Sequence, residues 1–249
     1  MWWAPFTFKE GQWYSWHLGG AEICIRREGR NWQGYCMGLR WEKRGGSCSG
    51  PEAVAEPEKT APMVNIVSRK TAALKPFFPE KPFLVNFKGV RLSPGNKITM
   101  DIGLPPMLYL IAEKSSGAPP DIIFNFTPFT LKESWFGKDP MEGVICSSIP
   151  LNNAACCSMD INCSITIRNK TKNTMELEKI PLYGSFLSIH EKDGKMTSDA
   201  MVIDAMENNF HKTVEPINNE QFTLLTQGNK NDPSLIIQGT RIIKNITGF

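Results

Sequence analysis

The stretch PFFPEKPFLVNFKGVRLSPGNKITMDIGLPPMLYLIA, residues 76–112, decides the fold class of this chain. Between Lys97 and Leu104, apolar residues alternate with polar or small ones, directly after the turn Ser93-Pro94-Gly95. A period of two is typical of a strand with one buried face, and Pro and Gly between such runs are typical of turns. The stretch therefore predicts antiparallel strands of a β-sandwich.

Alternating runs separated by turn residues continue on both sides of this stretch. Residues 5–44 predict a meander of short strands. Hairpins are expected around the turns Glu191–Gly194 and Gly228–Pro233, whose residues favour tight turns. Further strands are expected at residues 122–126, 144–149, 164–168, 174–180 and 241–246. The chain is therefore expected to be all-β.

Three segments give weaker signals. Residues 131–143 favour a loop or turn, and residues 63–74 fit either a short strand or a helix. Asp199–Phe210 is the best helix candidate, although short apolar runs cannot be assigned by periodicity alone.

The spacing of these elements suggests two β-units. Residues 76–180 match the length of an immunoglobulin-like antiparallel β-sandwich, which is roughly 100 residues. Residues 1–50 are too few to fold alone and are expected to join residues 181–249 in a second, smaller β-unit. Residues 51–75 are expected to be a linker or long loop, because Gly, Ser, Pro, Ala and Glu dominate residues 45–62.

Composition and charge place the chain among ordinary soluble proteins. The net charge is +3, and the first 50 residues carry it, with seven Lys or Arg against four acids. The longest apolar run, Leu104–Ala112, is far shorter than the roughly 20 residues of a membrane helix, and no signal peptide is visible. The seven cysteines are an odd number and are expected to be thiols in a reducing compartment. We therefore expect a cytoplasmic protein.

The best candidate for a partner-binding surface is the segment Glu133–Gly143. It presents Trp135 and Phe136 beside the carboxylates of Asp139 and Glu142. Tryptophan is a typical hot spot of protein interfaces, so this segment is expected to contact a partner. The alternative is that the two aromatic rings close one end of the sandwich.

The tryptophan-rich N-terminal region is a second candidate surface. Trp13 and Trp16 are candidates for contact with a partner or a second copy of the chain, and the alternative is that they are core residues at the junction of the β-units. Stacking on nucleic acid is not expected, because an excess of three positive charges is small for such a protein.

Catalytic and metal-binding patterns are weak. Cys156, Cys157 and Cys163 offer an alternative function in metal or ligand binding, but their spacing differs from paired zinc ligands, and buried thiols are preferred. No nucleophile, metalloprotease or phosphate-loop motif is present. The histidines are too scattered for a metal cluster: His17, His190 and His211. We therefore expect no enzyme, no metal and no cofactor.

Three segments, in order, resemble an uncharacterised prokaryotic family, the domain of unknown function 432. They are FFPEKPFLVNFKGVRLSPGNKITMDIGLPPMLYLI, SWFGKDPMEGVICSSIP and PLYGSFLSIHEKDGKM. The chain departs from the family pattern at Glu80, where Asp is commoner, and at residues 143–147, which lack the usual Glu and Tyr. The resemblance implies a fold but no activity, and it brings no catalytic residues. Family members are encoded near mechanosensitive-channel genes, which implies a membrane-channel partner.

These observations together predict a non-catalytic β-sandwich protein. It is expected to act as a protein-interaction or accessory module, in a larger or membrane-associated complex, with a protein partner or as a homo-oligomer.

Overall fold

The computed structural model describes residues 1–58, 62–112, 120–139, 142–150, 159–207, 210–229 and 243–245. Within these residues the protein is all-β, as expected, and the only helical elements are the two short 3-10 turns η1 (Trp41–Lys43) and η2 (Gly184–Phe186). No helix in this part of the chain has the length and apolar character needed to cross a membrane.

The contacts divide the chain into two compact units, each of which is described by itself. Unit 1 comprises Met1–Phe77, Pro105–Thr130 and Cys157–Asp160, and unit 2 comprises Phe78–Leu104, Leu131–Cys156 and Ile161–Phe249. This division differs from the one predicted from the sequence, because residues 76–180 are shared between both units. Some strands that are adjacent in sequence belong to different units, and the chain therefore passes between the units several times.

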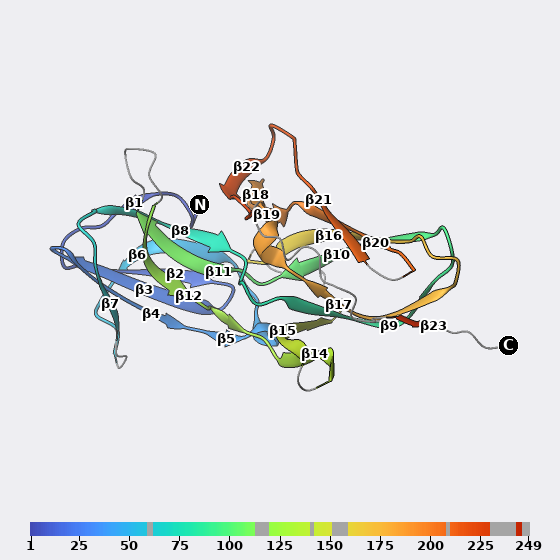
Figure 1. The fold of residues 1–249 in the computed structure, drawn as a ribbon. Coiled ribbons are helices and arrows are strands. Elements are labelled where there is room, and N and C mark those ends of the chain that lie inside the picture. Colours follow the sequence, from blue (N-terminus) through green and yellow to red (C-terminus); the bar gives the residue numbers. More distant parts are fainter. Residues whose placement is uncertain are drawn as a thin grey trace. The chain divides into compact units, whose positions relative to one another are not determined.

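Unit 1 contains a five-stranded sheet in the order β6-β2-β3-β4-β7 and a four-stranded sheet in the order β1-β8-β11-β12 (Figure 1). A short parallel pair joins β13 to β5. The strands of this unit are β1 (Phe6–Thr7), β2 (Trp13–Leu18), β3 (Ala21–Glu28), β4 (Asn31–Met37), β5 (Leu39–Arg40), β6 (Cys48–Val54), β7 (Met63–Ile66), β8 (Thr71–Phe77), β11 (Met107–Ala112), β12 (Asp121–Phe126) and β13 (Phe129–Thr130).

The aromatic residues of the N-terminal region form the core of unit 1. Trp16 and Trp32 are 1% and 0% exposed, and the ring of Phe8 meets that of Trp32 edge-on at 4.9 Å. Trp13 is also buried, on the other face of β2, where its ring centroid lies 5.4 Å from that of Tyr35. Both Trp13 and Trp16 are thus core residues of unit 1, which agrees with the alternative interpretation, and they do not form a partner-binding surface.

Unit 2 contains a five-stranded sheet in the order β14-β15-β9-β17-β23, and a second sheet in the order β21-β20-β16-β19-β18-β22 with β10 paired to β16. Several neighbours in these sheets are parallel, including β15 with β9 and β16 with β20, so the predicted purely antiparallel pairing is wrong. The strands are β9 (Phe83–Leu92), β10 (Lys97–Leu104), β14 (Glu133–Asp139), β15 (Glu142–Pro150), β16 (Ile161–Asn169), β17 (Met175–Leu182), β18 (Ile189–Lys192), β19 (Lys195–Ser198), β20 (Ala200–Ala205), β21 (Phe210–Glu215), β22 (Thr223–Thr226) and β23 (Ile243–Asn245).

Three local predictions are wrong for identifiable reasons. The expected linker at residues 51–75 contains most of β6, all of β7 and most of β8. β6 is an edge strand, where Pro51 removes no ladder hydrogen bond. The helix candidate from Asp199 contains β20, which lies between β16 and β21 and has both faces buried, so its apolar residues do not alternate. The expected loop at residues 131–143 contains the edge strand β14.

Candidate functional site

The candidate site lies at a fork in the second sheet of unit 2. β19 and β20 both run alongside β16, in parallel, with Asp199 between them. β19, Asp199 and β20 form one continuous segment of the chain. On the side of this segment that faces away from β16, the partner strand changes. Ser198 pairs with Ile189 of β18, whereas Ala200 pairs with Glu215 of β21. β18 and β21 therefore diverge at Asp199, and we call this place the fork.

The carboxylate of Asp199 binds the backbone of both branches of the fork. Its Oδ2 accepts a hydrogen bond from the Ser188 backbone N–H at 2.9 Å, and its Oδ1 accepts one from the Ile217 backbone N–H at 3.0 Å. Both N–H groups lie just beyond the strand pairs that end at the fork. Because a buried N–H without an acceptor is costly, Asp199 is the residue that makes the divergence stable.

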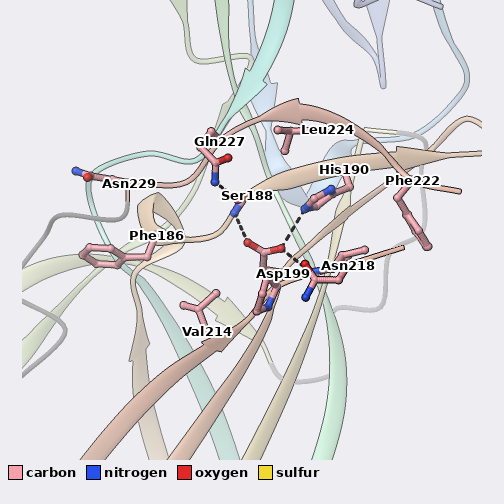
Figure 2. Close-up of a pocket in the computed structure, with 12 residues that line it drawn as sticks. Phe186, Ser188, His190, Asp199, Val214, Asn218, Phe222, Leu224, Gln227 and Asn229 are labelled. Atoms are coloured by element: carbon pink, nitrogen blue, oxygen red, sulfur yellow. Dashed lines mark hydrogen bonds and ion pairs between the residues drawn. The ribbon is translucent and has the colours of Figure 1, made fainter. Parts of the chain in front are cut away.

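His190 of β18 is the third partner of this carboxylate. Its Nε2 lies 3.0 Å from Asp199 Oδ1, in a pair whose side chains are 10% and 5% exposed (Figure 2). The other ring nitrogen, Nδ1, has no hydrogen-bond partner among the described residues. The carboxylate thus fixes the orientation of the imidazole, and one of its two nitrogens stays available.

The pKa of Asp199 lies below its ordinary value. Burial by itself would raise this pKa, but hydrogen bonds from the Ile217 and Ser188 backbone, the Ser188 hydroxyl and His190 favour the ionised form and outweigh it. Asp199 is therefore a carboxylate at neutral pH, and the imidazole nitrogen that faces it carries a proton and donates.

A pocket of about 550 Å³ opens beside the fork, within unit 2. Its apolar lining consists of Phe186, Val214, Pro216, Ile217, Phe222 and Leu224. Its polar lining consists of Ser188, His190, Asp199, Asn218, Gln227 and Asn229. Figure 2 shows these side chains converging from η2, β18, β21, β22 and the segments between them. A mostly apolar hollow with a few convergent polar groups is typical of small-molecule sites.

The segment after β22 completes one wall of the pocket. Gln227 Nε2 and the Gly228 backbone N–H donate to Ser188 Oγ at 2.9 and 3.2 Å. A Cβ at Gly228 would lie 2.3 Å from the carbonyl oxygen of Phe186, so only glycine permits this close approach. Ser188 Oγ is thereby held in a network of hydrogen bonds and is not placed as an activated nucleophile.

The charges near the pocket are unequal. Asp199 is the single acidic residue among the described lining residues, and no Lys or Arg is part of that lining. Lys192 lies close by, but its Nζ donates to Gln221 Oε1 at 2.5 Å and sits 5.3 Å from the centre of the Phe222 ring, without lining the pocket. The pocket thus contains a negative charge that no cationic side chain of its own lining balances.

The predicted partner-binding segment lies elsewhere in unit 2, on the hairpin of β14 and β15. Trp135 is 45% exposed and pairs across the strands with Ile145, which is 49% exposed. Phe136 is half-buried, and the side chains of Asp139 and Glu142 lie outside the described part. The exposed position of Trp135 fits the predicted surface role.

The cysteine-based alternative finds little support in the described residues. Cys156 and Cys157 lie outside them, and Cys163 is fully buried, which raises the pKa of its thiol to about 12. A thiol with such a pKa is a poor metal ligand and a poor nucleophile. Within the described part of the chain, no group of three or more metal-binding side chains comes together.

Sequence reasoning missed the pair of His190 and Asp199. The hairpin predicted around residues 191–194 is confirmed, and its register places His190 opposite Thr197, two residues before Asp199. That register would have placed the two residues near each other. Nothing in the sequence, however, indicates that Ile217, Phe222 and Gln227 approach the same point, because β21 and β22 reach it through long-range pairing.

Comparison with known proteins gives one match. The model of a family described as protein of unknown function (DUF432) matches residues 2–233. Neither the curated proteins nor the solved structures gave a match.

Proposed function

Because the chain belongs to this family of proteins of unknown function, its function has to be inferred from its own residues, and we propose that unit 2 binds a small molecule in the fork pocket. The observation that carries the proposal is the imidazole of His190, which Asp199 holds in place while Nδ1 has no partner among the described residues. An acceptor in a pocket wall that has no partner in the chain can be satisfied by a ligand that donates to it.

The proposed function is binding without catalysis. Ser188 carries the one hydroxyl of the described pocket lining, and its Oγ accepts hydrogen bonds from Gln227 and Gly228. A nucleophile activated by His190 would instead have to lie within hydrogen-bond reach of its available nitrogen. The arrangement therefore favours recognition of a ligand over acyl or phosphoryl transfer.

The test is a ligand-observed NMR screen of a library of small fragments against the full chain and two variants. Leu224 lines the pocket and is 48% exposed, so Leu224→Arg blocks the pocket without disturbing the core. Thr223→Arg changes the exposed neighbour on the same strand, outside the pocket lining, and is the matched control.

We expect fragments that bind the wild type and Thr223→Arg but not Leu224→Arg. Fragments that bind all three proteins equally occupy another site, and this outcome would overturn the proposal. An absence of fragments that bind the wild-type protein would also overturn it.

A second candidate function is self-association through the hairpin of β14 and β15. β14 is an edge strand, and the cross-strand pair of Trp135 and Ile145 is about half exposed. Edge strands pair readily with a second copy of the same strand, and exposed tryptophan is a typical anchor of such contacts. This is the form in which the predicted interaction module finds support.

Sedimentation velocity tests this candidate on the wild type and on Trp135→Ala. We expect a concentration-dependent dimer for the wild type and a monomer for the variant, with thermal stability nearly unchanged. A wild type that stays monomeric at about 100 μM would exclude self-association, since that concentration exceeds the Kd of a specific dimer by a wide margin.

Other parts of the sequence-based prediction stay proposals. The immunoglobulin-like description is supported by the presence of two larger sheets in each unit, although some strand pairs are parallel. The cytoplasmic location is supported by the thiols of Cys24, Cys36, Cys146 and Cys163. The membrane-channel partner rests on the family resemblance alone.

A further inference from the structure

We infer that the ligand class of the fork pocket is a small organic amine, whose ammonium group donates a hydrogen bond to His190 Nδ1 while its apolar body contacts the aromatic wall. This inference rests on the proposed function and deepens it. Three properties of the pocket lead to it: the tautomer of the imidazole, the charge of the lining and the shape of the apolar surface.

The tautomer of His190 requires a ligand that donates. Its Nε2 lies 3.0 Å from a carboxylate oxygen of Asp199, and an ionised carboxylate only accepts. The proton therefore resides on Nε2, and Nδ1 presents a lone pair. His190 is 8% exposed as a residue, while Nδ1 is not among the fully buried atoms that lack a partner, so a ligand in the pocket can reach this acceptor. A ligand that offers only acceptors would make no hydrogen bond with it.

The charge of the pocket selects among donors. With a neutral imidazole, the described lining carries the single negative charge of Asp199 and no cationic side chain. An ammonium group at Nδ1 would lie on the opposite side of the imidazole ring from the Asp199 carboxylate. The negative charge of this carboxylate attracts a cation at that position. A hydroxyl group can make the same hydrogen bond without the charge, whereas a carboxylate is repelled and cannot donate.

The apolar wall defines the rest of the ligand. Phe186 and Phe222 lie on different sides of His190 and Asp199 in Figure 2, and Val214 and Leu224 add to the apolar lining. A volume of about 550 Å³ accommodates a ring with a short chain.

A bare metal ion does not fit these observations. Both oxygens of Asp199 already accept hydrogen bonds from the chain, and His190 Nδ1 is the one imidazole nitrogen that the lining offers. Metal ions in proteins take three or more protein ligands in most sites. An organic cation needs only one acceptor and an apolar surface.

The experiment compares three probes of nearly equal shape, which are benzylamine, benzyl alcohol and benzoate. Each is titrated at pH 7.5 into the ¹⁵N-labelled full chain, and binding is measured from the amide shifts of residues at the pocket. We expect the Kd of benzylamine to be about tenfold lower than that of benzyl alcohol, because hydrogen bonds from charged donors are about twice as strong as neutral ones. Benzoate is expected to give no saturable shift.

His190→Phe and Leu224→Arg separate the causes. His190→Phe removes the acceptor and keeps an aromatic ring, so the tenfold preference for benzylamine over benzyl alcohol should be lost. Leu224→Arg should weaken all probes, and it protects the test if His190→Phe fails to fold. Thr223→Arg is the control and should bind benzylamine as the wild type does.

The outcomes distinguish this inference from the proposed function. If benzyl alcohol or benzoate binds the pocket as tightly as benzylamine, the pocket is a binding site but the amine inference is wrong. If no probe shifts the pocket amides, the amine inference is also wrong, and the fragment screen then decides whether the proposed function survives. A preference for benzylamine that persists in His190→Phe would likewise refute the role of His190 Nδ1.

Discussion

Replacing Asp199 by Asn tests the central feature of unit 2, because it keeps the size of the side chain and removes its charge. The carboxylate accepts hydrogen bonds from the Ser188 N–H, the Ile217 N–H and His190 Nε2, while Asp199 is 3% exposed. An Asn side chain has one acceptor oxygen. If this oxygen stays with Ile217 and His190, the Asn NH₂ group faces the Ser188 N–H, and two donors oppose each other.

The expected loss follows from these contacts. One buried N–H without an acceptor costs about 1–3 kcal/mol, and two hydrogen bonds that change from charged to neutral lose about 0.5–1 kcal/mol each. We therefore expect Asp199→Asn to destabilise unit 2 by about 2–5 kcal/mol at neutral pH. The matched control is Asp193→Asn, in the turn of the neighbouring hairpin, where the residue is exposed and its φ of 52° suits Asn equally well.

The pH dependence supplies an independent check. The pKa of Asp199 is lower in the folded protein than in the unfolded chain, so its charge stabilises the fold above the unfolded pKa, and this stabilisation is lost as the pH falls through the folded pKa. The Asn variant has no charge to lose. The difference in stability between the two proteins should therefore shrink on acidification below about pH 4, the ordinary range of an Asp carboxyl.

Hydrogen exchange measured by NMR at the Ser188 and Ile217 amides is the appropriate assay, since a chain of two units need not unfold in one step. Faster exchange of both amides in Asp199→Asn, with Asp193→Asn unchanged, is the expected result. A variant within 0.5 kcal/mol of the wild type would refute the reasoning, as would a difference that stays constant down to pH 3.

The remaining predictions concern unit 1 and the thiols. Arg44 and Asp160 form a buried ion pair with two hydrogen bonds, of 2.8 and 3.0 Å. Arg44→Met should therefore lower the free energy of unfolding, measured by urea titration, by about 3–5 kcal/mol. A loss under 1 kcal/mol would show that the pair is dispensable. A Cβ at Gly34 would lie 2.8 Å from the Phe124 ring, whereas a Cβ at Gly45 would meet nothing within 4 Å. Gly34→Ala should therefore destabilise the protein by about 1–3 kcal/mol in thermal melts, and Gly45→Ala should have almost no effect. Equal melting temperatures of the two variants would contradict the packing described. Burial raises the pKa of the Cys163 thiol to about 12, so iodoacetamide at pH 8 should label this cysteine only after unfolding. Peptide mass spectrometry measures the labelling, and labelling of Cys163 in the folded protein would contradict its burial.

The outcomes for individual elements show what kind of signal each prediction used. The alternation around Lys97–Leu104 and the turn at Glu191–Gly194 depend on neighbours in sequence, and both the strand and the hairpin are confirmed. The strand β20 was not foreseen, because its residues are buried on both faces and an apolar run of this length is compatible with a helix or a strand. β6 was not foreseen either, since its Gly and Pro are tolerated only at the edge position that the sheet gives it.

The division into units was beyond the reach of local signals. Continuous blocks of sequence were expected to form continuous β-units, whereas β9 and β10 belong to unit 2 and β11 and β12, which follow them, belong to unit 1. Periodicity tells which face of a strand is buried but carries no information on which distant strand will pair with it.

The sequence by itself determined that this protein is all-β, where many of its strands and turns lie, and that it belongs with an uncharacterised family. The fold class and the strands follow from short-range alternation and turn chemistry, and the family from the match of its sequence pattern. Only the tertiary structure decided that the N-terminal tryptophans are core residues and that β18 and β21 separate at Asp199. The fork pocket exists because a partner strand changes along one continuous segment, and that change is set by hydrogen bonds between residues far apart in the chain.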